Sequence, residues 1–134
     1  MSIERFSLDT SMVMRLVTRD PLPLFRSAVN FLEAQTQPLL LNDLVLAEAY
    51  FALQYHYGYP KADAIDALRQ FTSHPLLAPT SHARAIFSLP DLATSKPGFV
   101  DRLIHGAARE SGHLLVTFEK AAAKLPGCLI LRAP

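Results

Sequence analysis

Residues 99–120 read FVDRLIHGAARESGHLLVTFEK and contain the clearest sequence pattern of the chain. Their apolar spacing predicts an amphipathic helix over residues 99–111, followed at once by an apolar strand over residues 114–118. Asp101 lies in the first turn of this helix, and Glu119 directly follows the strand. Because α/β folds bind ligands at the carboxyl ends of parallel strands, both acids are candidate site residues.

The composition is that of a folded domain. The chain has 134 residues, of which 50% are hydrophobic, and a net charge of +1. These values exclude a disordered chain and give no general attraction for nucleic acids, so any basic surface must be local. Cys128 is the only cysteine, which excludes an internal disulfide. No apolar run reaches membrane-spanning length and no secretion signal is evident, so we expect one cytoplasmic domain over residues 1–134.

Strands and helices alternate along the rest of the chain. Apolar runs predict further strands at residues 3–9, 38–41 and 128–131. Helical spacing predicts helices at residues 12–17, 24–34, 43–57 and 61–72, with a short one at 120–123. Residues 73–81 are proline-rich and turn-like, whereas residues 83–89 fit a helix or a strand. The alternation predicts a layered α/β domain with a mainly parallel sheet.

Glu48 is the most informative acid outside that stretch. It is the only charged residue between Leu44 and Tyr55, and its neighbours one helical turn away are all apolar. This pattern predicts that its carboxylate faces inward, where it needs a proton, a charged partner or a metal ion. A buried salt bridge to an arginine, or a polar position at the rim of the core, is the structural alternative.

The other three acids each have an ordinary explanation. Asp9 ends a predicted strand and can cap the next helix, although Thr10 or Ser11 can cap it instead. Asp101 and Glu119 both stand at predicted helix starts, where an acid stabilises the helix dipole. Taken together, however, the four acids can converge in a parallel α/β sheet. Mg²⁺ or Mn²⁺ relieves the repulsion between clustered carboxylates, and such a site suits phosphodiester cleavage.

An ordered set of short motifs resembles a known family. The motifs are LDTS at 8–11, NDLVLAE at 42–48, FVDRLI at 99–104, TFEK at 117–120 and LPG at 125–127. Their order and spacing resemble the PIN-domain ribonucleases, and among these the VapC-type toxins of bacterial toxin–antitoxin pairs. The resemblance covers nearly the whole chain.

The resemblance implies a three-layer α/β/α fold and Mg²⁺- or Mn²⁺-dependent cleavage of RNA. It also implies a homodimer and a cognate antitoxin protein that inhibits the enzyme. The chain departs from the family pattern at Glu119, where Asp is usual, and at Ser11, where Asn is common. Glu is longer than Asp by one methylene, which changes the reach of the fourth acid.

The resulting hypothesis is that Asp9, Glu48 and Asp101 bind the metal ion and that Glu119 assists as a fourth acid. In this hypothesis Ser11 and Thr117 form hydrogen bonds to water or phosphate. The basic residues either contact the RNA backbone or belong to a solvated surface, and they are Arg15, Arg102 and Lys120.

Two other classes of function stay open. A catalytically silent binding module is one, supported by Glu119 in place of Asp. A phosphatase-like hydrolase is the other, but it needs a second Asp where Ser11 stands. The histidines show no zinc-binding spacing, and we expect His105, one turn after Asp101, to serve packing. The tyrosine-rich residues 50–59 suggest helix packing or a partner surface.

Overall fold

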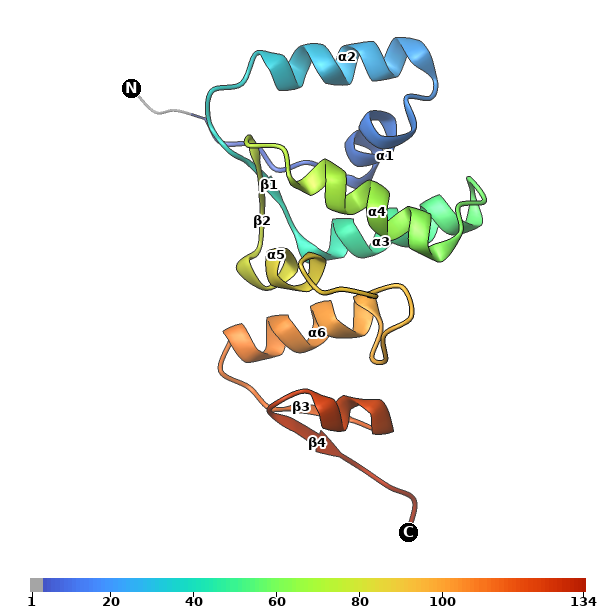
Figure 1. The fold of residues 1–134 in the computed structure, drawn as a ribbon. Helices are drawn as coiled ribbons and strands as arrows, with labels where there is room; N and C mark the ends of the chain where they lie inside the picture. The colour runs from blue at the N-terminus through green and yellow to red at the C-terminus, as the bar shows by residue number, and fades with distance from the viewer. Residues whose placement is uncertain (1–3) are drawn as a thin grey trace. The chain divides into compact units, whose positions relative to one another are not determined.

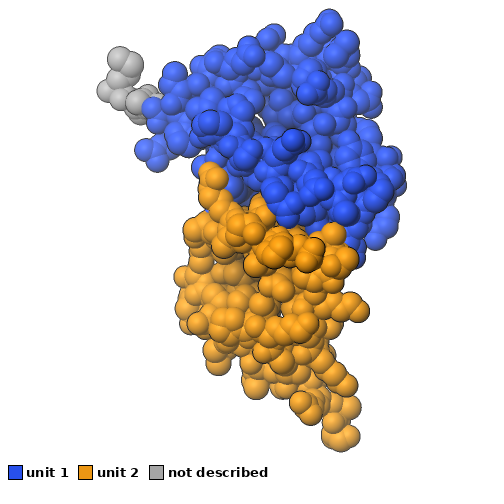
Figure 2. All heavy atoms as spheres, in the orientation of Figure 1, with its two compact units in different colours: residues 1–80 blue, residues 81–134 orange. Residues whose placement is uncertain are grey.

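A computed structural model describes residues 4–134 of the chain (Figure 1). The described residues form two compact units, unit 1 up to Thr80 and unit 2 over Ser81–Pro134. Figure 2 distinguishes the two units by colour. The predicted α/β class, with parallel strands, is confirmed, and the strands are grouped as one parallel pair in each unit.

Unit 1 contains four helices and two strands among its described residues. In chain order they are α1 (Thr10–Thr18), α2 (Leu22–Glu33), β1 (Leu39–Leu41), α3 (Asp43–Tyr55), α4 (Lys61–Thr72) and β2 (Leu77–Pro79). Strands β1 and β2 are parallel, with Leu40 opposite Ala78 (Figure 1). On the other side of β1, the Leu8 N–H donates to the Leu40 carbonyl at 2.9 Å.

The expected first strand is therefore partly confirmed. Ser7 forms an isolated parallel bridge with Leu40, and the chain then turns into α1. Residue 3, where the prediction begins, lies outside the described residues. This pairing fixes Asp9, the next residue but one, at the point where the extended segment ends.

Alternating burial in β1 shows which face of the sheet carries the core. Leu39 and Leu41 are buried, whereas Leu40 between them is 51% exposed. The spacing of α4 predicts an apolar stripe of Ala64, Ile65, Leu68 and Phe71, of which the first three are buried and Phe71 is half-buried. Helix α1 packs against α2 and α3, and α3 packs against α4. Burial of these apolar side chains is the main force that holds unit 1 together.

Unit 2 begins with two helices and ends with a parallel strand pair. Its elements are α5 (Ser81–Phe87), α6 (Phe99–Glu110), β3 (Leu115–Thr117), the 3₁₀ helix η1 (Lys120–Lys124) and β4 (Cys128–Ile130). Val116 of β3 lies opposite Leu129 of β4. Helices α5 and α6 pack together, and the rings of Phe87 and Phe99 lie 5.0 Å apart between centroids.

Two glycines shape unit 2. Gly106 of α6 lies directly against His82 of α5, so that an added Cβ would stand 2.6 Å from the His82 Cδ2 atom. Gly112 has φ +77°, a left-handed conformation that favours glycine, and it follows the end of α6.

The structure corrects the predicted turn at residues 73–81, because this segment contains β2, whose last residue is Pro79. It also resolves residues 83–89, which belong mostly to the helix α5. The helix predicted over residues 43–57 ends earlier, at Tyr55. Among residues 4–134, no helix combines the length and apolar character needed to cross a bilayer.

Candidate functional site

Asp9 stands at the N-cap of α1, with its side chain exposed. Its Oδ1 atom accepts the Ser11 hydroxyl at 2.7 Å and the Met12 N–H at 3.1 Å. These bonds, the Ser11 bond first, hold the pKa of Asp9 below its ordinary value. The ordinary reading of Asp9 as a helix cap is thus confirmed, and the alternative in which Thr10 or Ser11 replaces it is wrong. The carboxylate is nonetheless exposed and ionised, as a metal ligand must be.

Ser11 contacts Asp9 as well as solvent. Its hydroxyl donates to the carboxylate, which restricts the orientation of that carboxylate. Ser11 was predicted to bond water or phosphate, and the structure assigns its proton to Asp9.

Glu48 does not face inward, so the prediction of a buried carboxylate is wrong. Glu48 is exposed on α3, and Leu44 and Phe51 on the same side are 70% and 43% exposed. The rings of Phe51 and Tyr55 stack at 6.2 Å on this exposed side. The exposure also excludes the buried salt bridge, because an exposed carboxylate needs no buried partner, and it fits the other alternative, a polar position at the rim.

Asp101 and Glu119 are brought together by unit 2. Both are exposed, and both line one cavity of about 170 Å³. Thr117 lines the same cavity, and its Oγ1 atom accepts the Glu119 N–H at 2.9 Å. The other lining residues are mainly apolar, among them Ile104 and Val116. Thr117 therefore turns the chain at the end of β3 and places Glu119 on the side of Asp101.

The four acids are divided equally between the units. Asp9 and Glu48 belong to unit 1, whereas Asp101 and Glu119 belong to unit 2. Among the described residues of either unit, no three His, Cys, Asp or Glu side chains are grouped to hold a metal ion. All four are exposed oxygen donors, the ligand type that Mg²⁺ and Mn²⁺ prefer.

The predicted basic residues are held by backbone contacts or are exposed. Arg15 donates from Nη1 to the Asp20 carbonyl at 2.7 Å, and Arg102 donates from Nε to the Pro97 carbonyl at 2.8 Å. Lys120 is exposed. The side chains of Arg15 and Arg102 are therefore restrained. In the sequence these two cations lie close to Asp9 and Asp101.

His105 has a structural contact. Its Nε2 atom lies 2.6 Å from the carbonyl oxygen of Pro126, which ties α6 to the turn before β4. This contact agrees with the expected packing role.

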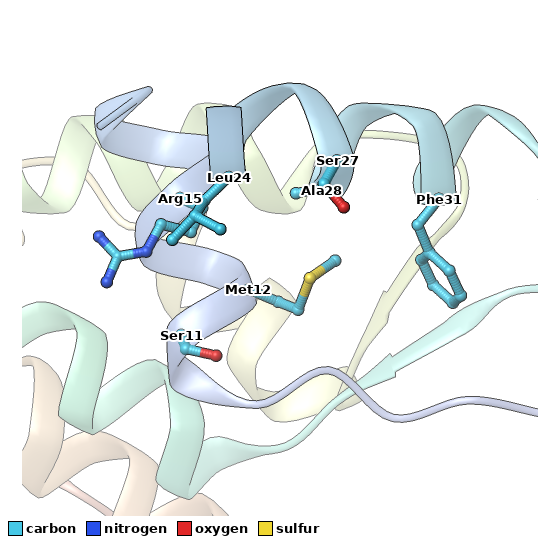
Figure 3. Close-up of a pocket in the computed structure, with 7 residues that line it drawn as sticks. All are labelled: Ser11, Met12, Arg15, Leu24, Ser27, Ala28 and Phe31. Carbon is cyan, nitrogen blue, oxygen red and sulfur yellow. The ribbon is translucent and has the colours of Figure 1, made fainter. Parts of the chain in front are cut away.

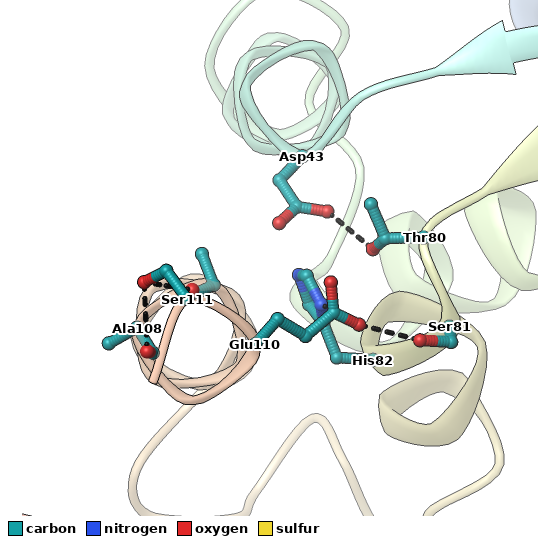
Figure 4. Close-up of polar contacts among 8 residues, drawn as sticks. Asp43, Thr80, Ser81, His82, Ala108, Glu110 and Ser111 are labelled. Carbon is teal, nitrogen blue, oxygen red and sulfur yellow. Dashed lines mark hydrogen bonds and ion pairs between the residues drawn. The ribbon is translucent and has the colours of Figure 1, made fainter. Parts of the chain in front are cut away.

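Sequence reasoning missed a polar cluster in unit 2 (Figure 4). Glu110 Oε1 accepts the Ser81 hydroxyl at 2.6 Å and lies 3.0 Å from His82 Nδ1. These contacts, the Ser81 bond first, lower the pKa of Glu110. The cluster joins α5 to α6. Ser81 and Glu110 are 29 positions apart in the chain, so no local sequence pattern indicates their contact. In unit 1, a separate hydrogen bond of 2.8 Å joins the Thr80 hydroxyl to Asp43.

Comparison with known proteins identifies the family. The PIN domain model matches residues 7–127, a range that runs through both units and contains all four acids. No curated protein and no solved structure matches the chain. PIN domains are generally nucleases and typically use divalent metal ions. This chain belongs to the PIN domain family.

Proposed function

We propose that this protein is a metal-dependent ribonuclease that hydrolyses phosphodiester bonds of RNA with Mg²⁺ or Mn²⁺. The observation that carries the proposal is the cavity of unit 2, which is lined by both Asp101 and Glu119 although they stand near opposite ends of residues 99–120. The family match supports nuclease chemistry. The exposure of all four acids leaves their oxygens accessible to a hydrated cation.

We assign the metal to Asp9, Glu48 and Asp101, directly or through water, with Glu119 as the assisting acid. A bound divalent ion lowers the pKa of a coordinated water and offsets charge on the attacked phosphate. Ser11 holds the Asp9 carboxylate in the ionised form that binds a cation. The assignment treats residues 1–134 as one PIN domain.

We further propose that RNA is bound through its phosphates. Arg15, Arg102 and Lys120 supply positive charge without reading sequence. Arg15 and Arg102 are restrained by their backbone contacts, so they lose less entropy when they bind phosphate.

The biological role that we propose is that of a VapC-type toxin. Its partners are then an antitoxin protein and a second copy of the chain, in the cytoplasm. The ordered motifs at 8–11, 42–48, 99–104 and 117–120 are the support for this role. A short reading frame next to the gene, whose product binds and inhibits the enzyme, is the expected finding.

The experiment that tests the proposal compares Asp101→Asn with Asp63→Asn. Asp63 also lies exposed in the first turn of a helix, α4, and has no place in the proposed site. Wild type and Asp63→Asn should cleave RNA with Mg²⁺ or Mn²⁺ and stop when EDTA is added. Asp101→Asn should fold and lose cleavage. Full metal-dependent cleavage by folded Asp101→Asn would reject the assignment.

A catalytically silent binding module is the second candidate, favoured by Glu119 at the position where the family usually has Asp. Such a module keeps the PIN fold and binds protein partners. Calorimetric titration separates the two, because a silent module binds no Mn²⁺.

A further inference from the structure

Helix α6 carries three polar side chains at intervals of four residues, Asp101, His105 and Arg109. Residues four apart are neighbours on a helix surface, so these three side chains share one side of α6. Asp101 lines the cavity of unit 2. His105 and Arg109 instead contact the turn at residues 125–127, which connects η1 to β4. The helix that supplies an acid to the cavity therefore also holds this turn.

His105 holds the turn by a hydrogen bond. Its Nε2 atom lies 2.6 Å from the Pro126 carbonyl oxygen, which can only accept, so the ring nitrogen is the donor. The neutral ring with its proton on Nε2 and the protonated ring both supply this donor. The contact is therefore available to either charge state of the histidine.

Arg109 contacts the next residue of the turn. A Cβ added at Gly127 would stand 2.8 Å from the Arg109 Cζ atom, so the guanidinium lies directly against the Gly127 backbone. The Gly127 carbonyl in turn accepts the Leu115 N–H at 2.9 Å, which joins the turn to the start of β3. Two neighbouring residues of the turn are thus held by two successive turns of α6.

Backbone hydrogen bonds connect this turn to Glu119. The Leu125 N–H donates to the Ala122 carbonyl at 2.9 Å, and the Ala122 N–H donates to the Glu119 carbonyl at 3.1 Å. On its other side, Glu119 donates its own N–H to Thr117 Oγ1 at 2.9 Å. Ala122 is 4% exposed, and it lines the cavity together with Leu125. The segment from Glu119 to the turn is therefore short, internally bonded and part of the cavity wall.

We infer that His105 is a positioning residue that fixes Glu119 relative to Asp101 in the cavity of unit 2. Asp101 stands on α6 one turn before His105, and Glu119 is tied to the turn at 125–127 through η1. The His105–Pro126 bond closes this loop of helix, 3₁₀ helix and turn. Without that bond, residues 119–127 keep their own hydrogen bonds but lose a connection to the helix that carries Asp101.

This inference rests on the proposed ribonuclease function, in which Glu119 assists the metal site. It adds to that function the residue that holds Glu119 in place. Because His105 acts through Glu119, its effect on metal binding should disappear when the Glu119 carboxylate is absent.

The test compares His105→Leu with His105→Gln. Leu removes the donor, whereas Gln carries an amide N–H at the same number of bonds from Cα as Nε2 of histidine. His113→Leu is the matched control, since His113 is exposed and its ring contacts Ser111 instead of the turn. Circular dichroism confirms folding, and hydrogen exchange of the Ala122 and Leu125 amides measures the loop without any metal. Calorimetric titration measures Mn²⁺ affinity.

His105→Leu should exchange the Ala122 and Leu125 amides faster and bind Mn²⁺ roughly 2- to 10-fold more weakly, the contribution of one hydrogen bond. His105→Gln should restore both values, and His113→Leu should leave both unchanged. In a Glu119→Gln background, His105→Leu should weaken Mn²⁺ binding no further. Should His105→Leu not fold, His105→Asn takes its place with the same expectations, because its side chain is one bond too short to reach Pro126.

Wild-type Mn²⁺ affinity in folded His105→Leu would overturn the inference. An equal loss of affinity with and without the Glu119 carboxylate would also overturn it, because that result indicates a general structural role. Failure of the ribonuclease proposal is a separate result, namely wild type that neither binds Mn²⁺ nor cleaves RNA. In that case the amide exchange alone decides whether His105 holds the loop.

Discussion

Asp9 is expected to have two roles that different substitutions separate. Its carboxylate caps α1 by accepting the Met12 N–H, and we assign the same carboxylate to the metal ion. Asn caps a helix about as well as Asp, whereas Ala removes the cap at a cost of about 1 kcal/mol, within a range of roughly 0.5–2. For a chain of this length, about 1 kcal/mol corresponds to roughly 3–5 °C in Tm. Asp9→Asn should therefore melt close to wild type, and Asp9→Ala a few degrees lower.

The pH dependence of stability tests whether the ionised carboxylate of Asp9 stabilises the folded state. The Ser11 hydroxyl and then the Met12 N–H hold the pKa of folded Asp9 below its ordinary value. The folded state thus binds this proton less readily than the unfolded state, so its contribution to stability is fully present above the ordinary pKa of 3.8. That contribution is lost as the pH falls through the lowered pKa. The stability difference between wild type and Asp9→Ala should shrink from pH 7 to pH 2.5.

Thermal unfolding by circular dichroism at both pH values measures the cap, and RNA cleavage with Mn²⁺ measures the catalytic role. Both variants should lose cleavage although only Asp9→Ala loses stability. An Asp9→Ala variant that melts with wild type would refute the capping argument. Full cleavage by Asp9→Asn would refute the metal assignment.

Three further predictions concern the framework of the two units. Leu53→Ala, at a fully buried residue of α3, should lower the free energy of unfolding by about 2–5 kcal/mol in chemical denaturation, and Tyr55→Ala, at a residue 78% exposed, should change it little. Gly106→Ala should cost about 1–3 kcal/mol because its methyl group collides with the His82 ring, and an unchanged denaturation midpoint would contradict that close contact. Glu110→Gln should lower Tm at pH 7 and much less at pH 3, since the lowered pKa of Glu110 makes its contribution present above the ordinary pKa and lost on acidification.

The fold was most predictable where one face of a helix is apolar and its ends are marked. The helix predicted over residues 61–72 is α4 with the same bounds, because its apolar stripe is narrow and Pro60 precedes it. Strand β2 was missed because it has only three residues and ends on Pro79. Its pairing with β1 depends on a segment 38 positions earlier in the chain, which local spacing does not reveal.

The site was less predictable because burial depends on packing partners. The apolar residues of α3 are distributed around the whole helix, so the sequence did not identify which side of the helix is buried. Leu44 and Phe51 are exposed, and Glu48 lies exposed with them. Local signals were more reliable at Asp9, where strand end and helix start coincide. The pocket that Ser11, Met12 and Arg15 of α1 form with Leu24, Ser27 and Phe31 of α2 (Figure 3) was not predicted, because its walls come from two helices and no short motif indicates that they pack together.

Calorimetric titration of Mn²⁺ into wild type, Asp9→Asn, Asp101→Asn and the double variant tests the proposal that Asp9 and Asp101 bind the same metal ion. Wild type should bind Mn²⁺, and each single substitution should weaken binding at least about tenfold, the effect of removing one charged ligand. Because the two acids share the ion, the double variant should lose little more than either single variant. Wild type that takes up no Mn²⁺, or single variants that bind it as tightly as wild type, would contradict the account.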